Sequence, residues 1–232
     1  MHKVNVDGLL SSQALFRHIS PSQLEQLRQD VVRVEVEKGK VLFRKGEVAE
    51  GAYVVVFGLV KLSVFSMEGT DKVLELIRPG QSFGEAMIFL DEPYPFCAEA
   101  LEHCLLLRIP PHALLRLLDQ SPRIARQMMN SLSHHLMGFI RNVERCSVQN
   151  ATQRVVEYLL QASDQQRSNE VKLDLKKSLL ASFLNLAPAT LSRVLHQLTD
   201  LHLIKVSGSL IQIQPDALKT YRHGSATAAM LN

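Results

Sequence analysis

A polar patch near the C-terminal end of the chain carries the side chains best suited to chemistry with another molecule. It falls within residues 188–199, where leucines and valines recur at three- and four-residue spacing and predict an amphipathic helix. The side chains of the opposite face are small or polar and include a guanidinium, an imidazole and an amide: Ala189, Ser192, Arg193, His196 and Gln197. Guanidinium and amide groups form hydrogen bonds with base edges in the major groove of DNA. We therefore expect this face to contact bases.

The segments around residues 188–199 provide the framework that a DNA-reading helix requires. A first helix is expected over roughly residues 176–184, and Asn185 after it suits the left-handed backbone of a tight interhelical turn. Two short strands, at 202–206 and 210–213, predict a hairpin. Helix, turn, helix and hairpin in this order indicate a winged helix-turn-helix. Contacts with DNA phosphates are expected from polar side chains around it: Lys176, Lys177, Gln153, Ser207 and Ser209.

The N-terminal part of the chain has a different pattern of apolar and turn-forming residues. Between residues 31 and 110, short apolar or alternating runs are separated by turn signals such as Lys45-Gly46 and Pro79-Gly80. This density of turns predicts an antiparallel β-roll of the jelly-roll kind, preceded by a helix that Ser20 and Pro21 cap. The expected helix covers residues 22–31, and the expected strands cover 32–36, 41–43, 53–57, 59–65, 73–77 and 105–109.

A long helix is expected between the two parts, over about residues 124–148. Its apolar side chains follow four- and three-residue steps, which indicates a heptad seam, and a second apolar row widens the band. One such helix can pack on its own β-roll and on a second copy of the chain, so we expect a homodimer. The expected seam residues are Met128, Leu132, His135, Phe139, Asn142 and Cys146, and the second row is Met129, Leu136, Ile140 and Val143. We therefore expect an α+β fold class, with the β-roll and the long helix at 1–149 and a DNA-binding part at 150–232.

Composition and charge restrict the function further. No apolar run reaches the length of a membrane span, and the first residues lack the apolar core of a signal peptide, so we expect a cytoplasmic protein that does not bind membranes. The three cysteines, Cys97, Cys104 and Cys146, contain no C-x-x-C pair and suit a reducing compartment. The net charge of +3 arises within residues 150–232, where nine basic residues face six acidic ones. We expect no enzyme, because the chain has no His-x-His ligand pair and no Gly-rich phosphate loop.

Three segments, in their order and spacing along the chain, resemble the Crp/Fnr superfamily of bacterial transcription regulators. The similarity covers residues 15–213 and is carried by the glycine-punctuated segment 38–91, by NATQRVVEYLL at 150–160 and by ATLSRVL at 189–195. The resemblance implies a dimer that binds an effector in the β-roll, repositions its DNA-binding domains through the long helix and recruits RNA polymerase.

Two effectors known in this superfamily do not suit the sequence. Cyclic-nucleotide-binding members follow a Gly-Glu pair, here Gly84-Glu85, with an arginine that holds the cyclic phosphate, but residues 86–99 contain no Arg or Lys. Phe96-Cys97 stands where that cation would be expected. An iron–sulfur cluster of the Fnr type needs four thiolates, and this chain has three cysteines. We therefore expect neither a cyclic nucleotide nor a cluster.

Segments 85–93 and 147–160 resemble most closely the regulators of dissimilatory nitrate respiration, the Dnr type. In that branch the sensor domain takes up haem and answers nitric oxide, so haem is a candidate cofactor. Core packing is the alternative explanation of the same apolar residues, and a different small-molecule or redox signal, or constitutive DNA binding, stays open. The expected effector pocket comprises Gly84, Glu85, Met87, Phe89, Phe96, Met128, Met129, Leu132 and Leu136, and the candidate haem ligands are His134, His135, His18 and His103.

The sequence also departs from the DNA-reading pattern of the Fnr and Dnr types. Their recognition helices contain Glu-x-x-Ser-Arg, whereas here Ala189 precedes Ser192-Arg193. Loss of the glutamate removes an acceptor for a cytosine amino group, which is worth about 1–3 kcal/mol of discrimination. We expect an Fnr-like palindromic site with relaxed or altered base choice at that position.

Overall fold

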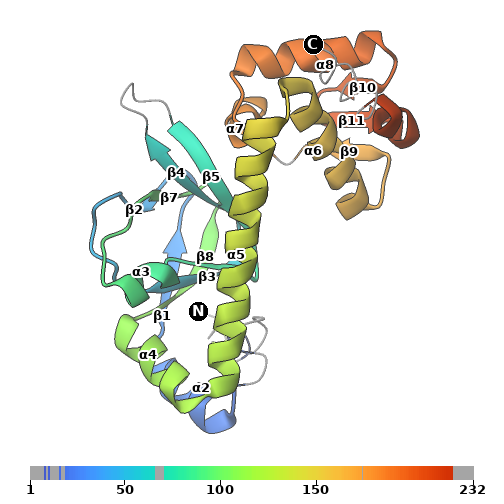
Figure 1. Cartoon of the computed structure of the whole chain (residues 1–232). Coiled ribbons are helices and arrows are strands. Elements are labelled where there is room, and N and C mark those ends of the chain that lie inside the picture. The colour runs from blue at the N-terminus through green and yellow to red at the C-terminus, as the bar shows by residue number, and fades with distance from the viewer. Residues whose placement is uncertain are drawn as a thin grey trace. The chain divides into compact units, whose positions relative to one another are not determined.

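The computed structural model describes residues 8, 10, 16, 19–65, 71–173 and 175–221 (Figure 1). The chain divides into two compact units, Met1–Gly138 and Phe139–Asn232. This boundary lies inside the long helix α5, Pro122–Val148, whereas the sequence placed the division after residue 149, where that helix ends.

The described residues of the first unit form eight strands in two four-stranded sheets. One sheet has the order β1-β8-β3-β6 and the other β2-β7-β4-β5, and the pairings within both are antiparallel. All six expected strands are present. The strands are β1 Val32–Val36, β2 Val41–Phe43, β3 Ala52–Phe57, β4 Val60–Phe65, β5 Asp71–Ile77, β6 Ser82–Phe83, β7 Cys97–Ala100 and β8 Cys104–Ile109.

Aromatic packing dominates the core of the roll. The rings of Phe43 and Tyr94 stack at a centroid distance of 3.6 Å, and Tyr53 stacks on Phe83 at 5.3 Å. Tyr94 is buried, and its hydroxyl donates to the backbone carbonyl of Gly51 at 2.7 Å, so its polar end is satisfied inside the core. This cluster fixes the loop that carries Tyr94 against β3.

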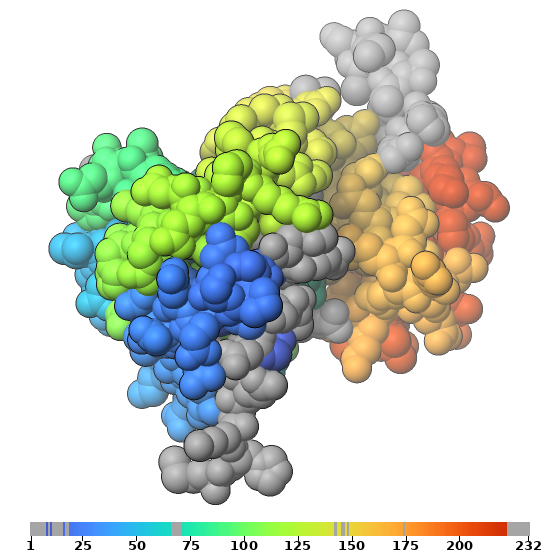
Figure 2. Space-filling model, turned by 90° about the horizontal axis from the view of Figure 1, so that it is seen from below, coloured from blue at the N-terminus to red at the C-terminus, as the bar shows by residue number. Residues whose placement is uncertain are grey.

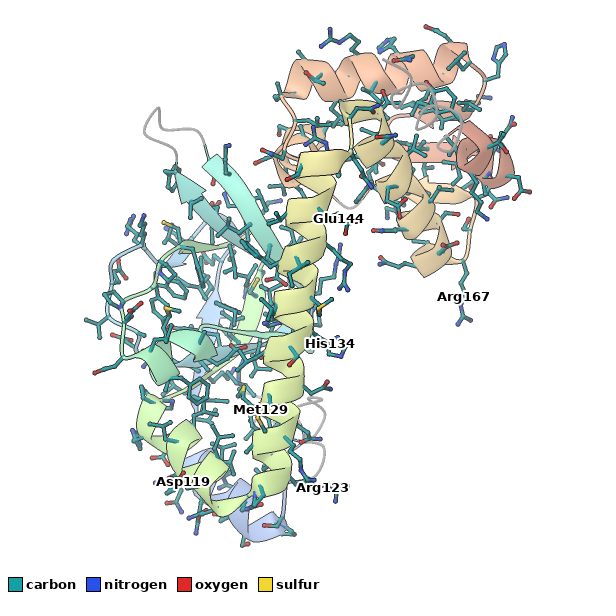
Figure 3. The ribbon with its side chains drawn as sticks, viewed as in Figure 1. Asp119, Arg123, Met129, His134, Glu144 and Arg167 are labelled. Atoms are coloured by element: carbon teal, nitrogen blue, oxygen red, sulfur yellow. The ribbon has the colours of Figure 1, made fainter. Side chains whose placement is uncertain are left out.

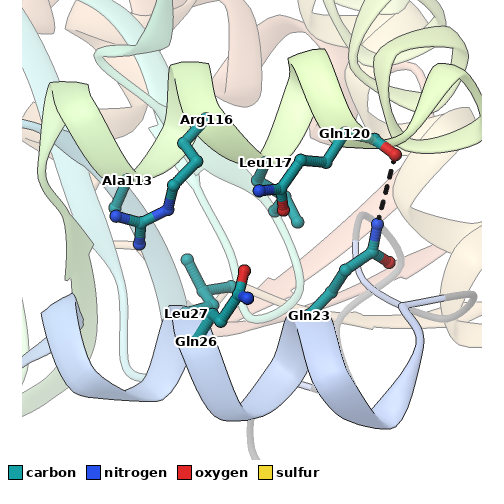
Figure 4. A pocket seen from close by; sticks show the side chains of 7 residues that line it. All are labelled: Gln23, Gln26, Leu27, Ala113, Arg116, Leu117 and Gln120. Carbon is teal, nitrogen blue, oxygen red and sulfur yellow. Dashed lines mark hydrogen bonds between the residues drawn. The ribbon is translucent and has the colours of Figure 1, made fainter.

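Helices pack against the roll and form a second core with it. Helix α2, Pro21–Asp30, begins at the capping box formed by Ser20 and Gln23. Together with α4, Pro111–Gln120, and the first part of α5, it encloses a second core that includes Leu27, Leu114 and Met128. Figure 2 shows α2 and α4 in contact on one face of this unit, and Figure 4 shows the shallow hollow between them, where Gln23 donates to the Gln120 carbonyl at 3.5 Å.

Two helices of the first unit and two of its strands were not anticipated from the sequence. Helix α3, Glu85–Leu90, is too short to show a full apolar period, and β6 and β7 contain only two and four residues. Helix α4 carried a usable signal, because Pro111 stands at its first turn and Ala113, Leu114 and Leu117 follow at helical spacing.

The second unit contains the expected winged helix-turn-helix. Its helices are α6 Ala151–Gln166, α7 Lys177–Phe183 and α8 Pro188–Asp200, followed by a helical segment at 215–221. Strands β10 Ile204–Ser207 and β11 Leu210–Ile213 form the predicted hairpin, and β9 Glu170–Lys172, which was not predicted, pairs with β11 as a third strand. Among the described residues no single helix is long and apolar enough to cross a bilayer, although α7 and α8 meet that test as a pair bent by 99°.

Gly58, between β3 and β4, allows a test of how closely the roll is packed at this turn. Its φ is +94°, and a Cβ there would lie 2.6 Å from the Cys104 sulfur and 2.7 Å from the His103 carbonyl oxygen. We expect Gly58→Ala to lower the free energy of unfolding by about 2–5 kcal/mol, the sum of backbone strain and overpacking. Gly46→Ala is the matched control, because its φ is +89° but nothing lies within 4 Å of the added Cβ. Equal losses in urea unfolding of the two variants would contradict the packing argument.

Candidate nucleic-acid interface

Helix α8 has two faces of opposite character. Every residue of its predicted apolar stripe is buried, and none is more than 5 % exposed: Leu191, Val194, Leu195 and Leu198. Every residue predicted to contact bases is exposed: Ala189, Ser192, Arg193, His196 and Gln197. The helix therefore presents its polar face to solvent as a continuous surface, with one guanidinium near its centre.

The turn before α8 is fixed by local backbone chemistry and by one distant side chain. Asn185 has a φ of +53°, as expected for this turn, and Pro188 occupies the first turn of α8. Arg154 of α6 donates from Nη1 to the carbonyl oxygens of Leu184 and Asn185, at 3.0 and 3.1 Å. These bonds use carbonyl groups that the end of α7 leaves without helical partners. This role of Arg154 was not predicted from the sequence, where the residue stood out only as a member of the family-like segment 150–160.

Two side chains of the exposed face of α8 make hydrogen bonds within the unit. Nδ1 of His196 lies 3.0 Å from the carbonyl oxygen of Ser192, one turn earlier. The Gln197 amide nitrogen donates to the Tyr221 hydroxyl at 3.3 Å, which joins α8 to the helical segment at 215–221. Both contacts restrict the orientation of a side chain that would meet DNA.

Four of the five residues expected to contact phosphates are exposed. Lys176 and Lys177 lie at the start of α7, and Ser207 and Ser209 lie at the turn of the β10–β11 hairpin. Gln153 differs. Its side-chain oxygen accepts from the backbone N–H of Asn150 at 3.0 Å and completes the capping box of α6. The Gln153 oxygen therefore caps the start of α6, whereas the sequence predicted a contact with a DNA phosphate.

In the first unit, a buried acidic group lies where the effector was expected. Glu85 is 2 % exposed, and its Oε1 lies 3.4 Å from the Ser82 hydroxyl and 3.6 Å from Nδ1 of His135 on α5. Burial raises the pKa of Glu85, the positive charge of a protonated His135 opposes this, and the nearby Glu75 adds to it. Burial likewise raises the pKa of Glu75. We name Glu75, Glu85 and His135 the acidic cluster.

The other residues of the expected effector pocket do not share one surface. Met128 is 2 % exposed and belongs to the core formed with α2 and α4, whereas Met87 and Phe96 pack against the aromatic core of the roll. Gly84 begins α3 in a left-handed conformation, and Leu132 packs beside Met128. The remaining three, Phe89, Met129 and Leu136, are 44 %, 58 % and 60 % exposed. The expected apolar lining is therefore wrong as a single set.

The exposed apolar surface of α5 also differs from the expected seam. Met128, Leu132 and His135 contact the roll or its helical cover in their own chain, so the first half of the predicted seam is wrong. The side chains of Asn142 and Cys146 lie outside the described residues. The exposed row, here called the α5 stripe, is Met129, Leu136, Met137, Phe139, Ile140 and Val143. The row that was expected only to widen the band therefore forms most of the free face.

The candidate haem ligands are not brought together. His134 is exposed on the side of α5 that faces away from the roll (Figure 3), and His135 faces Glu85 instead. His103 is exposed beside the ring of Phe57, at a centroid distance of 5.3 Å. His18 lies outside the described residues. The described candidates therefore do not share one site.

The position expected to hold a phosphate-binding cation carries none. Phe96 and Cys97 stand there, and the Cys97 sulfur accepts from the backbone N–H of Lys45 at 3.4 Å. Lys61, a buried cation of the same sheet, is paired with Asp71 and with Glu99, the latter at 2.7 Å. Its charge is compensated within the fold, so Lys61 is not free to hold an anion.

Comparisons with known proteins agree with this architecture. Residues 33–121 match the model of the cyclic nucleotide-binding domain, and residues 153–221 match that of the Crp-like helix-turn-helix domain. The fumarate and nitrate reduction regulatory protein of Vibrio cholerae is 26% identical over 84% of this chain and 80% of its own length. The transcriptional activator protein Anr of Pseudomonas protegens is 27% identical over 77% of this chain and 75% of its own.

Solved structures give the same result. DNR from Pseudomonas aeruginosa is 35% identical and covers 93% of this chain and 97% of its own, with a TM-score of 0.50. FixK2 from Bradyrhizobium japonicum, at 20% identity, shares the fold over 82% of this chain and 96% of its own, with a TM-score of 0.71. With its sensor-type β-roll, its winged helix-turn-helix and these relatives, the chain belongs to the Crp/Fnr family of transcription regulators.

Proposed function

We propose that this regulator binds an Fnr-like palindromic DNA site as a homodimer, with α8 of each copy in the major groove. The observation that carries the proposal is the complete separation of α8 into a buried aliphatic face and an exposed polar one. Arg193 supplies a planar pair of donors for guanine, and Lys176 and Lys177 supply charge for the phosphates. Specific DNA binding by this face would then allow the protein to recruit RNA polymerase at chosen promoters.

The α5 stripe supports the dimeric form of the proposal. Leu136 and Phe139 are each 60 % exposed, and Met129 and Val143 are more than half exposed. A row of large apolar side chains along one helix is costly in water and is covered when a second copy of the helix packs against it. Dimerisation would also match the two-fold symmetry of a palindromic site.

The polar groups of the roll support a signal other than a cyclic nucleotide. A buried phosphodiester needs a fixed cation, but Glu85 and Glu75 contribute carboxylates to this region, and Lys61 is already paired. We propose that the signal is a different small molecule or a redox change. Haem, and nitric oxide acting through it, is expected from the resemblance to the Dnr type alone.

DNA recognition by α8 is tested with two single substitutions. On the sequence selected by the wild-type protein from random duplexes, we expect Arg193→Ala to lose about 1–3 kcal/mol of binding free energy per half-site and to relax the preference at one base pair of each half-site. Lys177→Ala should weaken binding to all sequences alike and make the salt slope shallower by about two units, one for each copy in the dimer. Fluorescence anisotropy at several salt concentrations measures both. Uniform weakening by Arg193→Ala would contradict its role in base recognition.

The α5 stripe is tested by the oligomeric state. Ile140 is 47 % exposed, and Ile140→Glu would bury two carboxylates in a symmetric interface. We expect sedimentation velocity to show a dimer for the wild type and a dissociation constant at least roughly tenfold higher for the variant. Asn130→Glu is the control, because it adds the same charge at an exposed polar position of α5. A monomeric wild type, or equal dimerisation of both variants, would overturn the assignment.

The acidic cluster predicts an unusual dependence of stability on pH. Because burial raises the pKa of Glu85 above its value in the unfolded chain, its contribution to stability is complete below the ordinary glutamate range and is lost as pH rises through the raised pKa. We expect Glu85→Gln, which cannot ionise, to have a higher Tm than the wild type at pH 8. This advantage should disappear by about pH 4.

Glu92→Gln is the matched control for this experiment, because Glu92 is an exposed glutamate close to α3. Its thermal midpoint should follow that of the wild type at every pH. If Glu85→Gln changes the Tm by the same amount at pH 4 and pH 8, the ionisation of Glu85 does not limit the stability of the roll.

A further inference from the structure

The side chains on the exposed face of α8 differ in what they can offer a base. Arg193 only donates, Ala189 has no polar side-chain atom, and the amide nitrogen of Gln197 is bonded to Tyr221, which leaves the Gln197 oxygen as an acceptor. The Ser192 hydroxyl can donate or accept, so it fits several base edges and discriminates poorly. His196 is also exposed on this face, and whether its imidazole donates to a base or accepts from one depends on which ring nitrogen carries the hydrogen.

The contact between His196 and Ser192 determines that character. Nδ1 of His196 lies 3.0 Å from the Ser192 carbonyl oxygen, and a carbonyl oxygen can only accept. Nδ1 must therefore carry the hydrogen. In a neutral imidazole the other nitrogen, Nε2, is then an acceptor, because only one of the two ring nitrogens is protonated. His196 is exposed on the face of Arg193, so its free nitrogen belongs to the DNA-reading surface.

We propose that His196, oriented by the Ser192 carbonyl, reads an exocyclic amino group in the major groove through Nε2. Two bases present such a group there, cytosine at N4 and adenine at N6. This inference rests on the proposed DNA-binding function and assigns to His196 a specificity that the family resemblance does not include.

His196 does not replace the glutamate that is missing at position 189. The two positions are seven residues apart, which is about 10 Å along the helix axis at 1.5 Å per residue. Base pairs are spaced about 3.4 Å apart, so one side chain at each position meets a different base pair. The half-site should therefore have a relaxed position served by Ala189 and a separate position, served by His196, where cytosine or adenine is preferred.

Site selection on random duplexes, with the full-length protein at pH 8, tests the proposal. We expect His196→Ala to lose roughly 5- to 100-fold of the preference at one position while the rest of the half-site stays unchanged. His196→Gln keeps an acceptor and should retain the choice of an amino-bearing base. His196→Lys only donates and should shift the choice at that position toward guanine. His134→Ala, which removes an exposed histidine of α5, is the control.

The outcomes separate this inference from the proposed function. If the wild-type protein selects no sequence at all, the proposed function fails. If the wild type selects a palindrome and His196→Ala selects the same one with the same preference, only the role of His196 fails. Nitrogen-15 NMR of the imidazole adds a measurement without DNA: at pH 8 we expect the hydrogen on Nδ1, and a hydrogen on Nε2 would overturn the proposal.

Discussion

The packing of four aliphatic side chains of α8 against α6, α7 and β10 is the interaction on which the proposed DNA recognition depends. It holds the helix in one rotation about its axis, so that Arg193 and His196 share the opposite, exposed face. Removal of one such leucine costs about 2–5 kcal/mol. Arg154 adds a second restraint, because it ties the carbonyl groups of the preceding turn to α6. Base recognition requires side chains held to within a fraction of an ångström, and these two restraints provide the rigid support.

The sequence was sufficient for features with a strong local signal. The stripe of α8, the left-handed Asn185 and the Pro188 helix start follow from periodicity and backbone preference, and the structure places all three as expected. The short strands β6, β7 and β9 were missed because two to four residues show no clear alternation. Arg154 and the partnership of Glu85 with His135 were missed for a different reason. They join residues 30 and 50 positions apart, and no local pattern signals such contacts.

The assignment of the α5 faces shows where periodicity stops being informative. The helix has two adjacent apolar rows, and a heptad pattern alone does not decide which of them the same chain covers. The packing decides it: Met128 enters the core with α2 and α4, and the row that includes Met129 and Leu136 stays exposed. The same packing directs His135 toward the buried Glu85, so an imidazole that the sequence offered as a seam residue or an iron ligand becomes the neighbour of a buried carboxyl group.

The central claim is that the outer face of α8 meets bases in the major groove, and methylation interference on the selected DNA tests it most directly. Methyl groups at guanine N7 occupy the major groove, whereas those at adenine N3 occupy the minor groove. We predict that N7 methylation blocks binding at guanines in two half-sites about one helical turn apart, and that N3 methylation at the same base steps has little effect. Interference confined to the minor groove, or spread evenly along the duplex, would contradict the account.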